Sequence, residues 1–92
     1  MAAEKGDSEA QFILGDIYYY GVGLEPNKID AIGCYETAAE MGNIDAQRTL
    51  GHMYYYGIEH NLTKASKWFE MAANQGDEES KRFLSEIKSK NK

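Results

Sequence analysis

The chain has 92 residues, of which fifteen are acidic, ten are basic and one is cysteine, and its formal charge is −5 at neutral pH. Because Cys34 has no second cysteine to pair with, an internal disulfide and a cysteine metal cluster are excluded, and a pI near 4.9 argues against a nucleic-acid partner, which needs a basic patch. No run of 18 apolar residues and no signal-peptide pattern occurs, so we expect a cytoplasmic location and no membrane partner.

Three similar segments show that the sequence repeats itself. They are AAEKGDSEAQFILG from Ala2, AAEMGNIDAQRTLG from Ala38 and AANQGDEESKRFLS from Ala72, spaced by 36 and then 34 residues. Repeated units of this length stack on one another to bury a continuous core. We therefore expect a single repeat domain over 1–92, composed of the end of a preceding repeat (1–6), a first repeat (7–42), a second repeat (43–76) and a partial, capping repeat (77–92).

Within each unit, apolar residues recur with the helical period i, i+3, i+4 and i+7, as in Ala10, Ile13, Leu14 and Ile17. Three glycines, each followed by Asp or Asn, predict that one helix ends in a left-handed residue and the next begins at an N-cap; they are Gly6, Gly42 and Gly76. In chain order, we predict helices over 8–20, 28–41, 44–56, 62–75 and 78–89. The expected fold class is all-α, an α-α superhelix in which antiparallel helix pairs form a right-handed solenoid.

The repeated residues follow the pattern A-x-x-x-L-G-x-x-Y-x-x-G, a turn, K-A, an aromatic pair and A-A-E-x-G. The first copy has Ala10, Leu14, Gly15, Tyr18, Gly21, Gly23, Ala31, Tyr35, Ala38, Ala39 and Gly42, and the second has Ala46, Leu50, Gly51, Tyr54, Gly57, Lys64, Ala65, Trp68, Phe69, Ala72, Ala73 and Gly76. This pattern resembles the Sel1-like repeat, a TPR-like α-solenoid family, over nearly the whole chain. The first copy departs from it where Asp30 replaces the preferred lysine, and where Gly33 and Cys34 lie near the position that holds Trp68 in the second copy.

No set of residues in the sequence indicates catalysis or a cofactor. The two histidines have no carboxylate spacing that would make a metal site, so we expect His52 on an exposed helix face and His60 in a turn. The acidic residues fall at helix starts and on solvent faces, and no nucleophile or phosphate-loop motif occurs. Asn61-Leu62-Thr63 matches a glycosylation acceptor, but Asn61 is better interpreted as a helix cap. We therefore expect no enzyme activity, no cofactor and no metal.

Two tyrosine triplets, at 18–20 and 54–56, carry the candidate binding surface. At about 100° per residue, the first tyrosine of each triplet turns inward, and the second, Tyr19 or Tyr55, turns outward. This outward face continues along the first helix of each repeat, which in helix-pair solenoids generally lines the concave side. We name this candidate groove the first-helix stripe; it comprises Phe12, Asp16, Tyr19, Arg48, His52, Tyr55, Arg82 and Glu86.

The resemblance implies a scaffold that binds a protein or peptide partner noncovalently, and the helical periodicity leads us to expect that partner on the first-helix stripe. Two alternatives stay open, because bacterial Sel1-like proteins also resemble immunity or accessory factors of toxin or secretion systems, and some cysteine-rich relatives have been described as β-lactamase-like hydrolases. The hydrolase alternative is the weaker one, since those relatives pair cysteines within each repeat and Cys34 has no mate. We also predict weak, reversible self-association through the open N-terminal end, where Ile13 and Ile17 present apolar surface.

Overall fold

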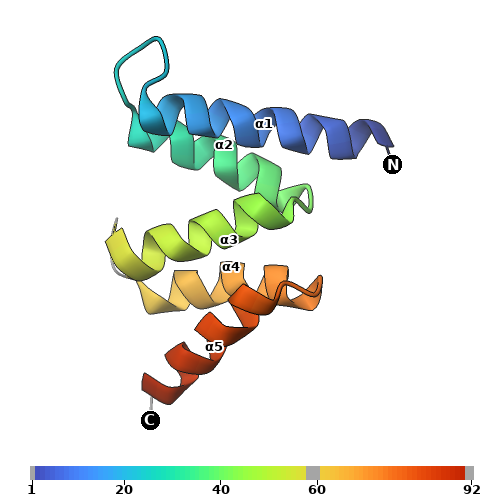
Figure 1. The fold of residues 1–92 in the computed structure, drawn as a ribbon, viewed down its shortest axis with the longest axis vertical. Coiled ribbons are helices and arrows are strands. Elements are labelled where there is room, and N and C mark those ends of the chain that lie inside the picture. The colour runs from blue at the N-terminus through green and yellow to red at the C-terminus, as the bar shows by residue number, and fades with distance from the viewer. Residues whose placement is uncertain (1, 58–60, 91–92) are drawn as a thin grey trace. The chain divides into compact units, whose positions relative to one another are not determined.

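The computed structural model describes residues 2–57 and 61–90, so the turn predicted at His60 lies outside the described residues. They form the α-helices α1 (Ala2–Tyr20), α2 (Lys28–Glu40), α3 (Ile44–His52), α4 (Leu62–Asn74) and α5 (Glu78–Lys90), and a π-helical turn, η1 (Met53–Gly57), that continues α3 (Figure 1). These residues contain no strand, and the all-α fold class is confirmed. No helix among them is long and apolar enough to cross a membrane. Their contacts divide the chain into two compact units, Met1–Ala46 and Gln47–Lys92.

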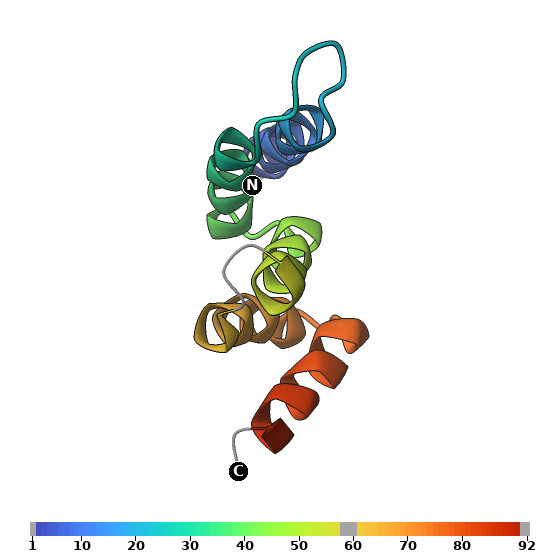
Figure 2. The ribbon, with the colours of Figure 1, turned by 90° about the vertical axis from the view of Figure 1, so that its left-hand side faces the viewer.

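In the first unit, α1 and α2 lie side by side and run in opposite directions (Figure 1, Figure 2). The chain reverses between them through Gly21 and Gly23, whose φ angles of 74° and 78° lie in the left-handed region that favours glycine. The turn closes where the Asn27 amide donates to the Tyr18 carbonyl at 2.7 Å. The Asn27 side chain then caps α2 by accepting a hydrogen bond from the Asp30 amide at 3.0 Å.

In the second unit, α4 runs back along η1 and α3, and α5 follows α4 obliquely (Figure 1). Asn61 repeats the role of Asn27, because its amide donates to the Tyr54 carbonyl at 2.9 Å and its side chain accepts from the Lys64 amide at 3.0 Å. Asn61 is therefore the predicted helix cap. The predicted left-handed glycine after α4 is also confirmed, since Gly76 has a φ of 99°.

A glycine on the first helix of each repeat faces an aromatic ring on the second helix. A Cβ added to Gly15 would lie 2.7 Å from the ring of Tyr35, and one added to Gly51 would lie 2.6 Å from the ring of Phe69. Both rings are buried, with 1% and 0% of their surface exposed. Because glycine has no side chain, the facing ring can pack directly against the helix backbone, and the two helices of each pair approach closely.

The predicted helix end at Gly6 and the predicted N-cap at Asp7 are wrong, because α1 runs without interruption from Ala2 to Tyr20. A glycine in a helix interior costs only about 1 kcal/mol relative to alanine, and the segment before it, Ala2 to Lys5, consists of good helix formers. A turn at this glycine is favoured only where a folded-back helix contributes contacts. In α1 the local preference for helix decides.

Asp77 caps α5 and pairs with Arg48, and the pair makes the second unit sensitive to acid. Burial alone would raise the pKa of Asp77, but hydrogen bonds from the Ser80 hydroxyl at 2.5 Å and amide at 3.0 Å, together with the Arg48 guanidinium at 2.7 Å, lower it. A carboxyl whose folded pKa is depressed stabilises the fold above its unfolded pKa of about 4, and the contribution is lost as pH falls toward the folded value.

We therefore expect Asp77→Asn, which keeps a capping oxygen and removes the charge, to lower the free energy of unfolding by about 1 kcal/mol at pH 7. The difference from the parent chain should shrink as pH falls below about 4. Urea unfolding followed by circular dichroism at a series of pH values measures both effects. A difference that stays constant with pH would contradict the role assigned to the carboxylate.

Candidate functional site

In the first unit, the members of the first-helix stripe gather around one side chain of α2. The Tyr35 hydroxyl donates to Asp16 Oδ1 at 2.5 Å. The rings of Phe12 and Tyr19 lie on either side, with centroids 5.5 Å and 6.4 Å from that of Tyr35. Burial, and then the hydrogen bond to Asp16, raise the pKa of Tyr35 far above its ordinary value. These three stripe residues are therefore half-buried and held in place, with part of each surface left to solvent.

In the second unit, the stripe residues contact α5. Three pairs join them: Arg48 with Asp77 at 2.7 Å, His52 with Glu79 at 2.8 Å, and the Tyr55 hydroxyl, which donates to Glu86 Oε1 at 3.5 Å. The three acidic residues lie on α5 or, for Asp77, at its N-cap, and they meet residues of α3 and η1. Both side chains of each pair belong to the second unit, so the interactions of Arg48, His52 and Tyr55 hold α5 in place.

His52 lies in an aromatic cluster, so the expectation that it occupies an exposed helix face is wrong. Its ring centroid is 5.4 Å from that of Phe69 and 5.0 Å from that of Phe83, and these two phenyl rings stack at 4.8 Å. The Nε2 atom is buried and within ion-pair distance of Glu79, although the two groups lack the alignment of a hydrogen bond. Phe83, on α5, thus fills the space in front of His52.

The prediction that Tyr55 turns outward is also wrong, since only 8% of its surface is exposed. Tyr54 is buried, as predicted, with 5% exposed. The π-helical turn η1 has hydrogen bonds from i to i+5, so successive residues advance by less than 100° and Tyr55 stays close to the buried side. The ring of Phe83, 5.2 Å from that of Tyr55, then covers it. The remaining stripe residues, Arg82 and Glu86, are exposed on α5.

The structure instead exposes the third tyrosine of each triplet, which the sequence analysis did not include in the stripe. Tyr20 is 68% exposed and Tyr56 is 69% exposed. Each meets the preceding tyrosine edge to face, with centroid distances of 4.9 Å for Tyr19 and 4.8 Å for Tyr55. The angular argument could have found them, because the third residue lies about 200° from a core-facing first residue.

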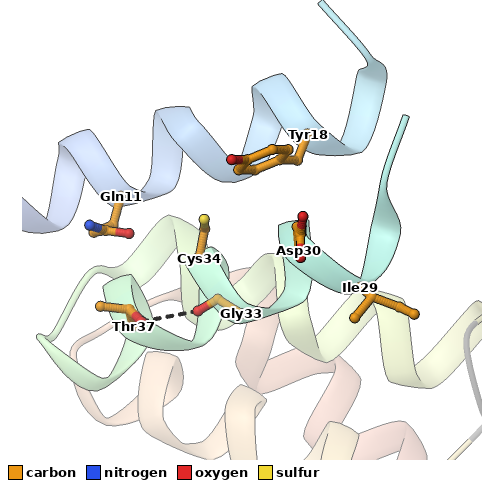
Figure 3. A pocket seen from close by; sticks show the side chains of 7 residues that line it. All are labelled: Gln11, Tyr18, Ile29, Asp30, Gly33, Cys34 and Thr37. Carbon is orange, nitrogen blue, oxygen red and sulfur yellow. Dashed lines mark hydrogen bonds between the residues drawn. The ribbon is translucent and has the colours of Figure 1, made fainter. Parts of the chain in front are cut away.

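The first unit also contains an open pocket between α1 and α2, of about 390 Å³ (Figure 3). Figure 3 shows Tyr18 on α1 across from Asp30 and Cys34 on α2, with the Cys34 sulfur directed toward α1. Its lining consists of Gln11, Tyr18, Ile29, Asp30, Gly33, Cys34 and Thr37. The sequence analysis did not predict this pocket, but three of its residues, Asp30, Gly33 and Cys34, are the departures from the repeat pattern noted above.

The pocket controls the chemistry of its thiol. Burial, and then the negative charge of Asp30, raise the pKa of Cys34. We expect alkylation by iodoacetamide to have a pH midpoint above that of a free cysteine, about 8.5, because the thiolate is the reactive form. Asp30→Asn should lower this midpoint. The rate is measured against pH by mass spectrometry, with the urea-unfolded chain as reference, and a folded midpoint equal to the unfolded one would contradict the prediction.

None of these side chains forms a recognisable metal centre. Across residues 2–57 and 61–90, no group of three or more His, Cys, Asp or Glu side chains lies close enough to hold a metal ion. The charged side chains instead form ion pairs within one unit, as Arg48 does with Asp77. What the geometry offers is a set of fixed surfaces, aromatic and polar, suited to contact with another molecule.

Comparison with known proteins identifies the repeat. The family model described as Sel1 repeat matches residues 8–43 and 44–77, together more than half of the chain. An uncharacterized Sel1-like repeat-containing protein of Schizosaccharomyces pombe is 49% identical over 37 residues, which are 40% of this chain and 6% of that protein.

Two solved structures share the fold. A Sel1 repeat protein from Oxalobacter formigenes matches with a TM-score of 0.84 and 33% identity, over 98% of this chain and 37% of that chain. The protein c5321, a protective antigen present in uropathogenic Escherichia coli strains and displaying an SLR fold, matches with a TM-score of 0.77 and 38% identity, over 92% of this chain and 19% of that chain. This chain therefore spans less than half the length of either protein.

The resemblance inferred from the repeated residues is thus confirmed by sequence and by structure. Sel1 repeat proteins are generally scaffolds without enzymatic activity, and their fold typically mediates protein–protein interaction. The chain belongs to the Sel1 repeat family.

Proposed function

We propose that this chain is a noncovalent binding module, which contacts a protein or peptide through the tyrosine pairs at the ends of the first helices of its repeats. The observation that carries the proposal is the exposure of Tyr20 and Tyr56, which occupy equivalent positions in the two repeats. Tyrosine supplies a large apolar ring with a polar tip and is enriched among residues that dominate binding energy. Both rings are largely exposed, although Tyr56 also borders the aromatic cluster, with its centroid 6.0 Å from that of Phe83 and 6.2 Å from that of His52.

Each exposed ring packs against the preceding tyrosine, which is itself held in place, and this favours binding. Tyr19 is half-buried against Tyr35, and the Lys28 ammonium lies 5.6 Å from the centroid of its ring. Tyr55 is fixed by Phe83 and Glu86. An aromatic side chain that is already held in place loses little conformational freedom when a partner docks on it, so more of the contact energy is left for affinity.

The first-helix stripe then divides by role. Phe12, Asp16 and Tyr19 keep part of their surface open and would border the contact in the first unit. In the second unit, Arg48 and His52 position α5 and Glu86 accepts a hydrogen bond from Tyr55, whereas the exposed Arg82 would face the partner.

Selection of binding peptides from a random library on the immobilised chain tests the proposal. Peptides of shared pattern should lose at least about tenfold in affinity, roughly 1.4 kcal/mol, on the Tyr20→Ala, Tyr56→Ala double variant. Both side chains are exposed, so the variant should keep its helicity and melting temperature. Tyr55→Ala is unsuitable as a test, because removing a buried ring would also destabilise the fold.

Met41→Ala is the matched control, since Met41 is 38% exposed and lies at the C-terminal end of α2, whereas Tyr19 is contacted by Lys28 at the N-terminal end of α2. It should leave peptide binding unchanged. Peptides that bind the double variant and the parent equally well, or no enrichment from the library, would overturn this assignment of the binding surface.

A further inference from the structure

The pocket of the first unit can be compared position by position with the second repeat of the same chain. Aligned on their tyrosine triplets, the first helices pair Tyr18 with Tyr54. Aligned on their N-caps, Asn27 and Asn61, the second helices pair Asp30 with Lys64, Gly33 with Lys67, and Cys34 with Trp68. The aromatic ring on the first helix is common to both. The side chains at the three positions on the second helix differ between the repeats in size, in charge or in both. The two repeats therefore share a backbone fold but present different side chains at this place.

In the second repeat, the chain supplies its own cation and its own large ring. The Lys64 ammonium lies 5.2 Å from the centroid of the Tyr54 ring, within the range of a cation–π interaction. Trp68 is 3% exposed and fills its site. In the second repeat, Lys64 and Trp68 therefore occupy the space that corresponds to the pocket.

In the first repeat, the same positions lack both groups. Gly33 and Cys34 are small, and the space they leave is the pocket. A carboxylate, Asp30, stands where the ammonium of Lys64 stands in the second repeat, opposite the ring of Tyr18 (Figure 3). The face of a tyrosine ring and a carboxylate both attract a cation, so the site is electrostatically suited to a positive charge from outside this repeat.

Two apolar side chains at or beside the pocket are exposed in the first repeat. Leu14 is 37% exposed, whereas its equivalent Leu50 is fully buried. Leu14 lies three residues after the pocket residue Gln11 and four before Tyr18, so it lies on the same side of α1, and Ile29, in the pocket lining, is 82% exposed. An apolar rim around a site for a cation matches a protein segment that presents a basic side chain among apolar neighbours, because the stem of such a side chain is itself apolar.

We propose that the pocket between α1 and α2 binds a lysine or arginine side chain of an amphipathic helix from a partner protein. The cationic head lies over the Tyr18 ring and pairs with Asp30, and its aliphatic stem packs against Ile29 and Cys34. The apolar neighbours of the basic residue cover Leu14. This site uses a surface different from the tyrosine pairs and does not depend on the function proposed for them.

The probe is a blocked, alanine-rich helical peptide with one central lysine flanked by leucines, titrated onto the complete 92-residue chain and followed by NMR. The matched control peptide has norleucine in place of lysine, which keeps the stem and removes the charge. We expect the lysine peptide to bind at least about tenfold more tightly than the norleucine peptide. Its binding should also protect Cys34, inside the pocket, from iodoacetamide.

Variants that copy the second repeat sharpen the test. Asp30→Lys, which copies Lys64, should weaken binding of the lysine peptide by at least about tenfold, and Cys34→Trp, which copies Trp68, should abolish it by filling the pocket. Tyr18→Phe should bind within about twofold of the parent and Tyr18→Leu should not, because the ring face, rather than the hydroxyl, attracts the cation. Circular dichroism establishes that each variant is folded.

Equal affinity for the lysine and norleucine peptides, or full affinity in Asp30→Lys, would overturn the proposal. Protection of Cys34 that rises with protein concentration and without peptide would assign the pocket to a second copy of the chain instead. The Tyr20→Ala, Tyr56→Ala variant should bind the lysine peptide normally. If it does not, the peptide contacts the tyrosine pairs and the pocket assignment fails, whatever the outcome for the function proposed above.

Discussion

Replacing Gly51 with alanine is expected to lower the free energy of unfolding by about 2 to 3 kcal/mol. The new Cβ would lie 2.6 Å from two carbon atoms of the Phe69 ring, a distance well below van der Waals contact. That ring cannot easily move, because it is fully buried and stacked on Phe83 at 4.8 Å. Alanine is the better helix former by about 1 kcal/mol, which offsets only part of the cost.

Gly33→Ala is the matched control. Gly33 also lies inside a helix, but a Cβ there would meet nothing within 4 Å. The substitution should therefore raise stability by about 0.5 to 1 kcal/mol through helix propensity alone. Urea unfolding monitored by circular dichroism compares the two variants with the parent. Equal effects of both substitutions would show that the contact between Gly51 and the ring of Phe69 does not limit the packing.

Much of the fold was predictable because the deciding signals are local and occur twice. Asn27 and Asn61 each follow a glycine-containing turn and precede an apolar-periodic segment, and both cap their helices. Gly42 and Gly76 both adopt a φ of 99°. A signal that recurs at the same place in two copies is far less ambiguous than one that occurs once.

The predictions that failed concern features that depend on neighbours outside the local sequence. Gly6 carries the same sequence signal as Gly42, yet it lies inside α1, because a helix-ending turn needs the contacts of a folded-back helix. Tyr55 repeats Tyr19 in the sequence, but η1 changes the helical advance and Phe83 covers the ring. Periodicity at 3.6 residues per turn contains no information about a π-helical turn.

The departures from the repeat pattern were more informative about the site than the matches. Positions that follow the pattern, such as Leu50, Phe69 and Ala72, are fully buried and serve packing. Asp30 and Cys34, which break it, line the pocket. The core positions of a repeat serve the packing of one repeat against the next. A smaller or charged residue at such a position in one copy therefore marks a place where that copy can accommodate a ligand.

The aromatic residue opposite each packing glycine also differs between the copies, and this difference predicts sensitivity to alkali. Tyr35 donates to Asp16 in the first repeat, where the second repeat pairs Phe69 with His52. Burial and the hydrogen bond to Asp16 raise the pKa of Tyr35 far above the unfolded value of about 10. A group whose folded pKa is raised stabilises the fold fully below its unfolded pKa, and that stability is lost as pH rises from there toward the folded value.

We therefore expect the parent chain to lose about 1.4 kcal/mol of stability for each pH unit above about 10 through Tyr35 alone. Tyr35→Phe, which copies Phe69, should cost about 1 kcal/mol at pH 7 by removing one hydrogen bond, and then lose less stability as pH rises. The two unfolding curves should cross between about pH 10 and 12, which urea titrations at fixed pH would detect. Other groups that titrate in this range are present in both proteins and contribute equally, so parallel curves would mean that Tyr35 ionises in the folded chain as readily as in the unfolded one.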